Sequence, residues 1–153
     1  MRQLSRNVVV TAALCGLVAA RWLLPYARST VTMTTPRGEI RVAMVGPTAP
    51  TGETSIGRDF VYDGLLLEWT ATGGRRLTTE GATRVLDLVW LDAESRTVAV
   101  FTGATPCRAR PCRSYELGGI DRAVMSLALP YGDAQRLGIG PGALVRRASP
   151  KGP

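Results

Sequence analysis

The side chains that could carry chemistry in this chain are a few carboxylates and a pair of cysteines, because its 153 residues include no histidine. Without an imidazole, every Ser-His, Cys-His and His-ligated metal mechanism is excluded within the chain. Asp87 is the most unusual carboxylate, since it stands between Leu86 and Leu88 in a strongly apolar stretch. A buried carboxylate is costly unless hydrogen bonds satisfy it. Asp87 is therefore either a structural group with hydrogen-bond partners, among which an arginine is a candidate, or the polar centre of a ligand pocket.

Three further polar residues are candidates for a binding site. Glu68 directly precedes Trp69 in a second apolar run, and Arg113 and Tyr115 follow the last cysteine. Two carboxylates, Glu68 and Asp87, are formally enough for a hydrolase, but the sequence does not place them near each other. We expect an unknown small ligand or envelope component as the partner. No cofactor is expected, and no metal, because the third cysteine, Cys15, lies in the N-terminal segment and leaves too few soft ligands.

Cys107 and Cys112 lie five positions apart, each directly after a proline. In an exported protein a disulfide is the first interpretation of such a pair. The spacing is not the C-x-x-C of redox enzymes, which disfavours catalytic thiol chemistry. Three arginines surround the pair and could hold an anionic group, although a solvated loop face is the more ordinary role for such a set: Arg108, Arg110 and Arg113.

Residues 1–28 have the pattern of an export segment. Arg2 and Arg6 precede 13 uncharged residues, 8–20, which end in small side chains, and Arg21 follows. The pattern fits a cleaved signal peptide or a retained membrane anchor, and both stay open. The basic residues before the apolar run predict that the body lies outside the cytoplasm, secreted or anchored to the cytoplasmic membrane. The arginines of this segment contribute a large part of the net charge of +7. Nucleic-acid binding is not expected, because no arginine run is interleaved with stacking aromatics.

The elements that must position these residues are mostly short strands. Alternating apolar residues predict a hairpin over 29–45 and a strand over 122–129. A short apolar run predicts a buried strand over 64–69, and further strands are expected over 97–102, as the hairpin partner of 84–92, and over 143–146. The strand at 84–92 is apolar on both faces, with Leu86, Leu88 and Trp90 on one and Val85, Val89 and Leu91 on the other, so it should lie inside the fold. Residues 46–59 and 103–119 are predicted to be irregular. One helical turn is expected at 133–137, with Asp133 as its N-cap and Gly138 at its end.

This pattern predicts an all-β fold, a sandwich or partly closed barrel of about seven to eight short strands with one short helix. We expect a single β domain over residues 29–148. Residues 149–153, rich in proline and glycine, are expected to form a disordered tail.

The second half of the chain, from about residue 85 to 145, resembles a family known as domain of unknown function 192. The motifs that carry the resemblance occur in order: Leu86-Asp87-Leu88, Pro106-Cys107, Pro111-Cys112-Arg113-Ser114-Tyr115, Leu127-Ala128-Leu129-Pro130 and Leu137-Gly138-Ile139. The resemblance implies a small, often exported β-rich domain and implies no reaction. Upstream the match is weaker, because Thr78–Ala82 lacks the tryptophan and asparagine of the family pattern. A ligand site that relatives form there would be lost or changed in this chain.

Two functions from different classes follow. The first is a non-catalytic binding or structural module of the cell envelope, which the export segment and the missing histidine favour. The alternative is a small enzyme with a carboxylate-centred pocket, for which envelope carbohydrate is a candidate substrate. A pocket that holds several of the polar candidates would favour the enzyme. A closed apolar interior with Asp87 bonded to arginine or backbone would favour the module.

Overall fold

The structure, a computed structural model, describes residues 29–45, 53–56, 62–69, 76–116 and 122–149. The predicted export segment, almost all of the predicted tail, and most of the stretch 46–59 lie outside the described residues. Within the described residues, no helix is both long and apolar enough to cross a membrane.

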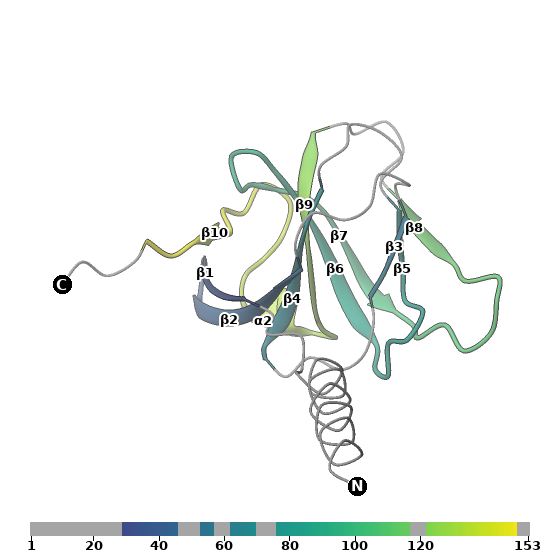
Figure 1. Cartoon of the computed structure of the whole chain (residues 1–153). Coiled ribbons are helices and arrows are strands. Elements are labelled where there is room, and N and C mark those ends of the chain that lie inside the picture. Colours follow the sequence, from purple (N-terminus) through teal and green to yellow (C-terminus); the bar gives the residue numbers. More distant parts are fainter. Residues whose placement is uncertain (1–28, 46–52, 57–61, 70–75, 117–121, 150–153) are drawn as a thin grey trace, which may run out of the picture.

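The described chain forms two β-sheets and one short helix, which confirms the predicted all-β class (Figure 1). A curled half-barrel sheet has seven strands in the order β10-β1-β2-β4-β9-β6-β7, and a small sheet has three in the order β3-β5-β8. The strands of the large sheet are β1 (Thr30–Thr35), β2 (Gly38–Val45), β4 (Gly64–Glu68), β6 (Leu86–Asp92), β7 (Thr97–Ala104), β9 (Ala123–Pro130) and β10 (Arg146–Arg147). Those of the small sheet are β3 (Glu53–Ser55), β5 (Arg76–Thr78) and β8 (Ser114–Glu116), and the helix is α2 (Asp133–Arg136).

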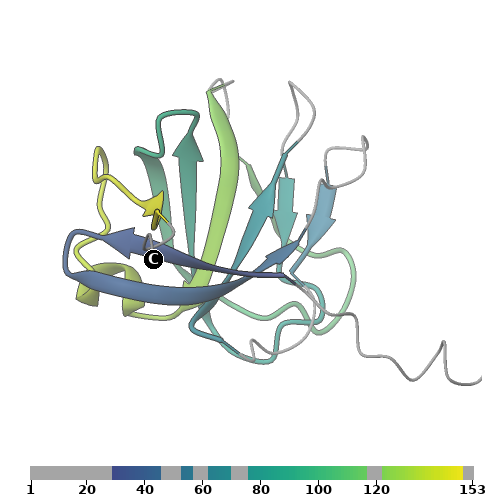
Figure 2. The same ribbon diagram turned by 60° about the vertical axis from the view of Figure 1, so that its left-hand side comes forward.

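The first hairpin forms as predicted, with Thr35 opposite Gly38 across the turn at Pro36 and Arg37. Strand β2 then pairs in parallel with β4, whereas the other pairings in the large sheet are antiparallel. Figure 2 shows the purple-to-blue hairpin lying across the direction of the pale-green β9. The large sheet therefore curls strongly and gains an inner side that the helix α2 can cover.

A segment near the C-terminal end of the described chain links the two edges of the curled sheet. Gly142 donates a 2.7 Å hydrogen bond to the carbonyl of Thr97, and Val145 donates one of 2.8 Å to that of Ser95, both beside β7. On the other side β10 pairs with β1, and Ala148 donates to the Thr32 carbonyl at 2.8 Å. The strand that was expected over 143–146 is shorter and begins later in the sequence, since β10 spans only Arg146–Arg147. Leu144 lies outside it because it makes only an isolated bridge to Arg96.

The central strands are apolar on both faces because the large sheet has a hydrophobic core on each side. Leu86, Leu88 and Trp90 of β6 belong to the core shared with the small sheet. Val89 and Leu91 of the same strand belong to the core inside the curl, which α2 covers. This confirms the predicted two-sided strand. Val85 is different: it precedes β6 and is 36% exposed, so it is not a core residue.

The side chains of β9 do not keep one alternation along the strand. Ala123 packs in the core shared with the small sheet, whereas Leu127 and Leu129 pack in the core inside the curl. The pairing of β6 with β9 shifts register between Leu91 and Asp92, and a shift of one residue moves a side chain to the opposite face. The short strands β3 and β8 form within stretches that were expected to be irregular, and each of them pairs with β5.

Gly64 offers a test of how tightly β4 and β9 pack. A Cβ atom there would lie 2.7 Å from the carbonyl oxygen of Ala128 and 2.9 Å from a methyl group of Leu129. We predict that Gly64→Ala lowers the free energy of unfolding by about 1–3 kcal/mol, because the backbone of β9 cannot yield cheaply. Urea unfolding followed by tryptophan fluorescence measures this change. The matched control is Gly140→Ala, whose Cβ would meet nothing within 4 Å. Equal effects of the two substitutions would contradict the packing argument.

Candidate functional site

Asp87 lies near the start of β6, fully buried, and its carboxylate accepts hydrogen bonds from three backbone amides. Oδ2 accepts from Gly132 N at 2.8 Å and from Ala134 N at 3.2 Å, and Oδ1 accepts from Gly103 N at 3.3 Å. The first two amides belong to the start of α2 and the third to β7. The structure thus gives Asp87 the structural role considered for it, with backbone amides rather than an arginine as its partners. That Asp87 also binds a ligand stays a prediction.

The same contacts correct the expected N-cap of the helix. The N-cap residue is Gly132, with φ +88°, and no side chain of the helix caps it. The first amides of a helix lack intrahelical acceptors, and here Asp87 supplies one from a neighbouring strand. Asp133 instead accepts a 2.8 Å hydrogen bond from Arg136 Nε, and this contact raises the pKa of the guanidinium above its ordinary value. Gly138, with φ +71°, follows the helix as expected.

Glu68 lies at the far end of the sheet from Asp87. It forms an ion pair with Arg147 of β10, and it stands opposite Met125 of β9. Asp87 stands opposite Leu129 of the same strand. Four residues of β-strand span about 13 Å, so these two carboxylates do not form a pair of the kind that a hydrolase uses.

Arg113 and Tyr115 lie together on the small sheet side. Tyr115 is 5% exposed and packs edge-on against Phe101, with ring centroids 6.1 Å apart. The Arg113 guanidinium carbon lies 5.1 Å from the centroid of the Tyr115 ring. Tyr115 belongs to the core between the sheets, whereas Asp87 bonds to α2, on the opposite side of the large sheet. The four predicted binding residues therefore occupy three separate places, and their ligand roles stay predictions.

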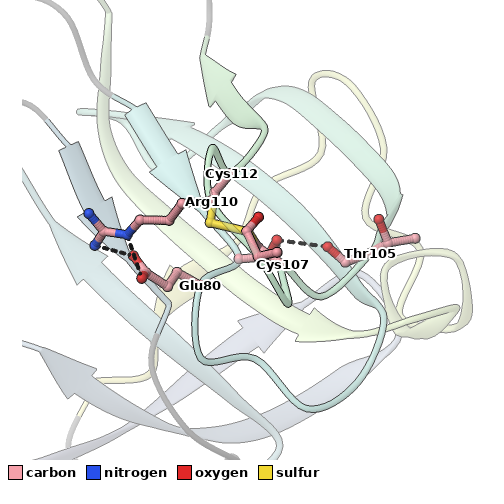
Figure 3. Close-up of a disulfide and its surroundings, with 7 residues drawn as sticks. Glu80, Thr105, Cys107, Arg110 and Cys112 are labelled. Atoms are coloured by element: carbon pink, nitrogen blue, oxygen red, sulfur yellow. Dashed lines mark hydrogen bonds and ion pairs between the residues drawn. A yellow bond between two sulfur atoms is a disulfide. The ribbon is translucent and has the colours of Figure 1, made fainter.

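The predicted Cys107–Cys112 disulfide is present, with the two Cα atoms 5.5 Å apart. The loop that carries it, residues 105–113, is fastened to the segment after β5. Thr79 Oγ1 donates to the Thr105 carbonyl at 2.7 Å, and the Thr79 carbonyl accepts from Cys107 N at 3.2 Å. Arg110 donates two 2.9 Å hydrogen bonds to the two carboxylate oxygens of Glu80 (Figure 3).

An open pocket of about 480 Å³ adjoins this loop, lined by Glu80, Arg110, Pro111 and Cys112. None of Asp87, Glu68, Tyr115 and Arg113 lines it. Sequence reasoning noted Arg110 but missed Glu80, because no pattern places a carboxylate of one loop against an arginine thirty residues later. The available signal was its position: Glu80 lies within Thr78–Ala82, the stretch that departs from the family pattern. Among the described residues, no three Cys, Asp or Glu side chains gather in a way that could hold a metal ion.

A family model described as DUF192, Uncharacterized ACR, matches residues 57–147. The match begins well upstream of residue 85, where the resemblance of individual motifs is weaker. No curated protein matches the chain.

Two solved structures are similar in fold. One is a protein of Sinorhizobium meliloti 1021 named as a candidate transcription regulator, at 18% identity and a TM-score of 0.59, covering 81% of this chain and 96% of that one. The other is a protein of unknown function from Novosphingobium aromaticivorans DSM 12444, at 19% identity and a TM-score of 0.59, covering 80% and 89%. At such identities the likeness shows the fold alone.

The role of Asp87 predicts a graded series of stabilities. Asp87→Ala should lower the free energy of unfolding by about 2–5 kcal/mol, because it leaves buried amides of α2 and β7 without an acceptor. Asp87→Asn should cost less, about 1–2 kcal/mol, because one oxygen remains to accept from Gly132 and Ala134. Urea unfolding measures both. Asp92→Asn is the control, since this carboxylate accepts from Arg96 N in an exposed turn. If Asp87→Ala were as stable as this control, the carboxylate would not hold the helix.

The disulfide should stabilise its loop far more than the fold. It closes a ring across only five positions, and the loop-entropy argument gives about 2 kcal/mol for so short a ring. A domain has a typical stability of about 5–15 kcal/mol. The double variant Cys107→Ala, Cys112→Ala should therefore still unfold cooperatively, with increased amide exchange confined to residues 103–119. Thermal melts and hydrogen exchange test this expectation, with reduced wild-type protein as the comparison. Loss of cooperative unfolding would show that the core depends on the bridge.

Proposed function

The chain belongs to the domain of unknown function 192 family, and from that premise we propose that it is an exported, non-catalytic β module that binds a partner in the cell envelope. The observation that carries this proposal is the Cys107–Cys112 disulfide, because structural disulfides persist in oxidising compartments and are rare in the cytosol. The export pattern of residues 1–28 points to the same compartment. The segment delivers the body across the membrane and is then removed or retained as an anchor.

The separation of the candidate carboxylates, Asp87 and Glu68, supports a binding module rather than an enzyme. A carboxylate-centred hydrolase needs two carboxyl groups on either side of one substrate. Asp87 is fully buried, and both of its carboxylate oxygens accept hydrogen bonds from backbone amides of α2 and β7. Glu68 is paired with Arg147 at the other end of the sheet. Among the described residues, the disulfide-closed loop and its pocket offer a surface for a partner, held on a rigid scaffold as binding loops commonly are.

Localisation of the full chain tests the proposal. Expressed in a Gram-negative host with its own N-terminus, the protein should fractionate with the periplasm or inner membrane, with Cys107 and Cys112 oxidised. Intact mass then separates the two forms: a chain that starts near Arg21 has lost Cys15, whereas an anchored chain retains it. A maleimide reagent applied without reductant counts the free thiols.

The matched control is the full chain with Leu14→Arg and Leu17→Arg, which interrupts the apolar run. This variant should stay in the cytoplasm, where the thiols of the loop are reduced. A wild-type chain that remains in the cytoplasm with both loop thiols free would overturn the proposed compartment.

A further inference from the structure

We propose that the disulfide-closed loop, together with the pocket that Arg110 lines beside it, binds a small polyanion, a molecule with at least two carboxylate or phosphate groups. This inference rests on the proposed function as a binding module and names the ligand class of its surface. Residues Pro106–Arg113 include three arginines and no acidic residue. Glu80 neutralises one of these charges through Arg110. The remaining positive charge favours a ligand that carries at least two negative charges.

The arginines of the loop are presented to solvent rather than buried. The side chain of Arg110 is 79% exposed even though it pairs with Glu80. Arg108 and Arg113 are exposed as well, and Arg113 rests on the face of Tyr115. Stacking on an aromatic ring fixes the plane of a guanidinium while leaving its N–H groups available. Arginine forks of this kind recognise carboxylates and phosphates with two parallel hydrogen bonds.

The loop is also held in place before any ligand arrives. The disulfide closes it, and the contacts of Thr79 with Thr105 and Cys107 fasten it to the segment after β5. Figure 3 shows the disulfide directly beside the Glu80–Arg110 pair. A loop that is already ordered loses little conformational entropy when it binds, which raises affinity.

Glu80 acts in this scheme as an internal competitor. Its carboxylate lines the pocket and occupies both donors of the Arg110 fork, which is the position that a carboxylate of the ligand would take. Both side chains are open to solvent, with exposures of 79% for Arg110 and 38% for Glu80. Ion pairs this exposed contribute little stability. A ligand anion can therefore compete with Glu80 for the Arg110 guanidinium.

The test uses the purified exported form of the full chain at low ionic strength. Citrate and inorganic pyrophosphate are titrated separately, with binding followed by calorimetry and by backbone amide shifts in NMR spectra. We expect saturable shifts centred on residues 79–80 and 107–114. The double variant Arg108→Gln, Arg113→Gln should weaken binding at least fivefold. Glu80→Gln should tighten it severalfold, because the carboxylate that competes with the ligand for Arg110 is removed. The comparison of the two probes identifies the anion class that the pocket prefers.

Arg146→Gln serves as the control, since Arg146 is an exposed arginine of β10 in the other sheet. It should change the affinity by less than twofold, and thermal melts confirm that each variant is folded. Absence of saturable shifts for both probes, or equal weakening by Arg146→Gln and the loop double variant, would overturn the site. A weaker affinity of Glu80→Gln would overturn the competitor role. If the protein is exported but binds neither probe, the anion site is refuted and the proposed compartment stands. If the protein stays in the cytoplasm but binds one of the probes, only the proposed compartment is refuted.

Discussion

One carboxylate joins three parts of this fold. Asp87 projects from a central strand of the large sheet and accepts hydrogen bonds from the end of β7 and from the first amides of α2. A helix of four residues has too few internal hydrogen bonds to persist by itself, and its N-cap is a glycine without a side chain. The helix is nevertheless needed, because Ala134 and Leu137 complete the core inside the curled sheet. The inner core, the helix and the sheet thus depend on the same buried charge.

The scaffold and the candidate binding surface are on different sides of the large sheet. The curl, α2 and the linking segment 142–148 enclose one core, while the small sheet and the disulfide-closed loop belong to the other side. Tyr115 contributes both to the core and to the surface on that side. Its ring packs against Phe101 in the core, and it supports Arg113 at the surface. Substitutions in the loop are therefore expected to leave the interactions around Asp87 unchanged.

The parts that the sequence predicted are those with a local signature. The first hairpin has a turn and period-two strands, β6 is apolar on both faces, and the cysteine pair is close in sequence. The parts that it did not predict depend on partners distant in the chain. Strands β3, β5 and β8 have three residues each, which is too short for any periodicity, and they exist because they pair with one another. Asp87 was recognised as unusual from its neighbours, but its amide partners come from 16 to 47 positions away. Glu80 was not predicted for the same reason, because its partner Arg110 lies 30 positions away in the chain.

The segment 142–148 has a consequence for the order in which the chain can fold. Strand β1 is among the first described residues, yet its outer partner β10 and the amide of Ala148 follow it by on the order of a hundred residues. Contacts between such distant positions form late, because the intervening loop must first be closed. A ribosome-bound chain whose C-terminal part has not yet emerged therefore cannot complete the curled sheet. Until then the outer edge of β1 stays unpaired, and an unpaired strand edge can pair with other chains and aggregate.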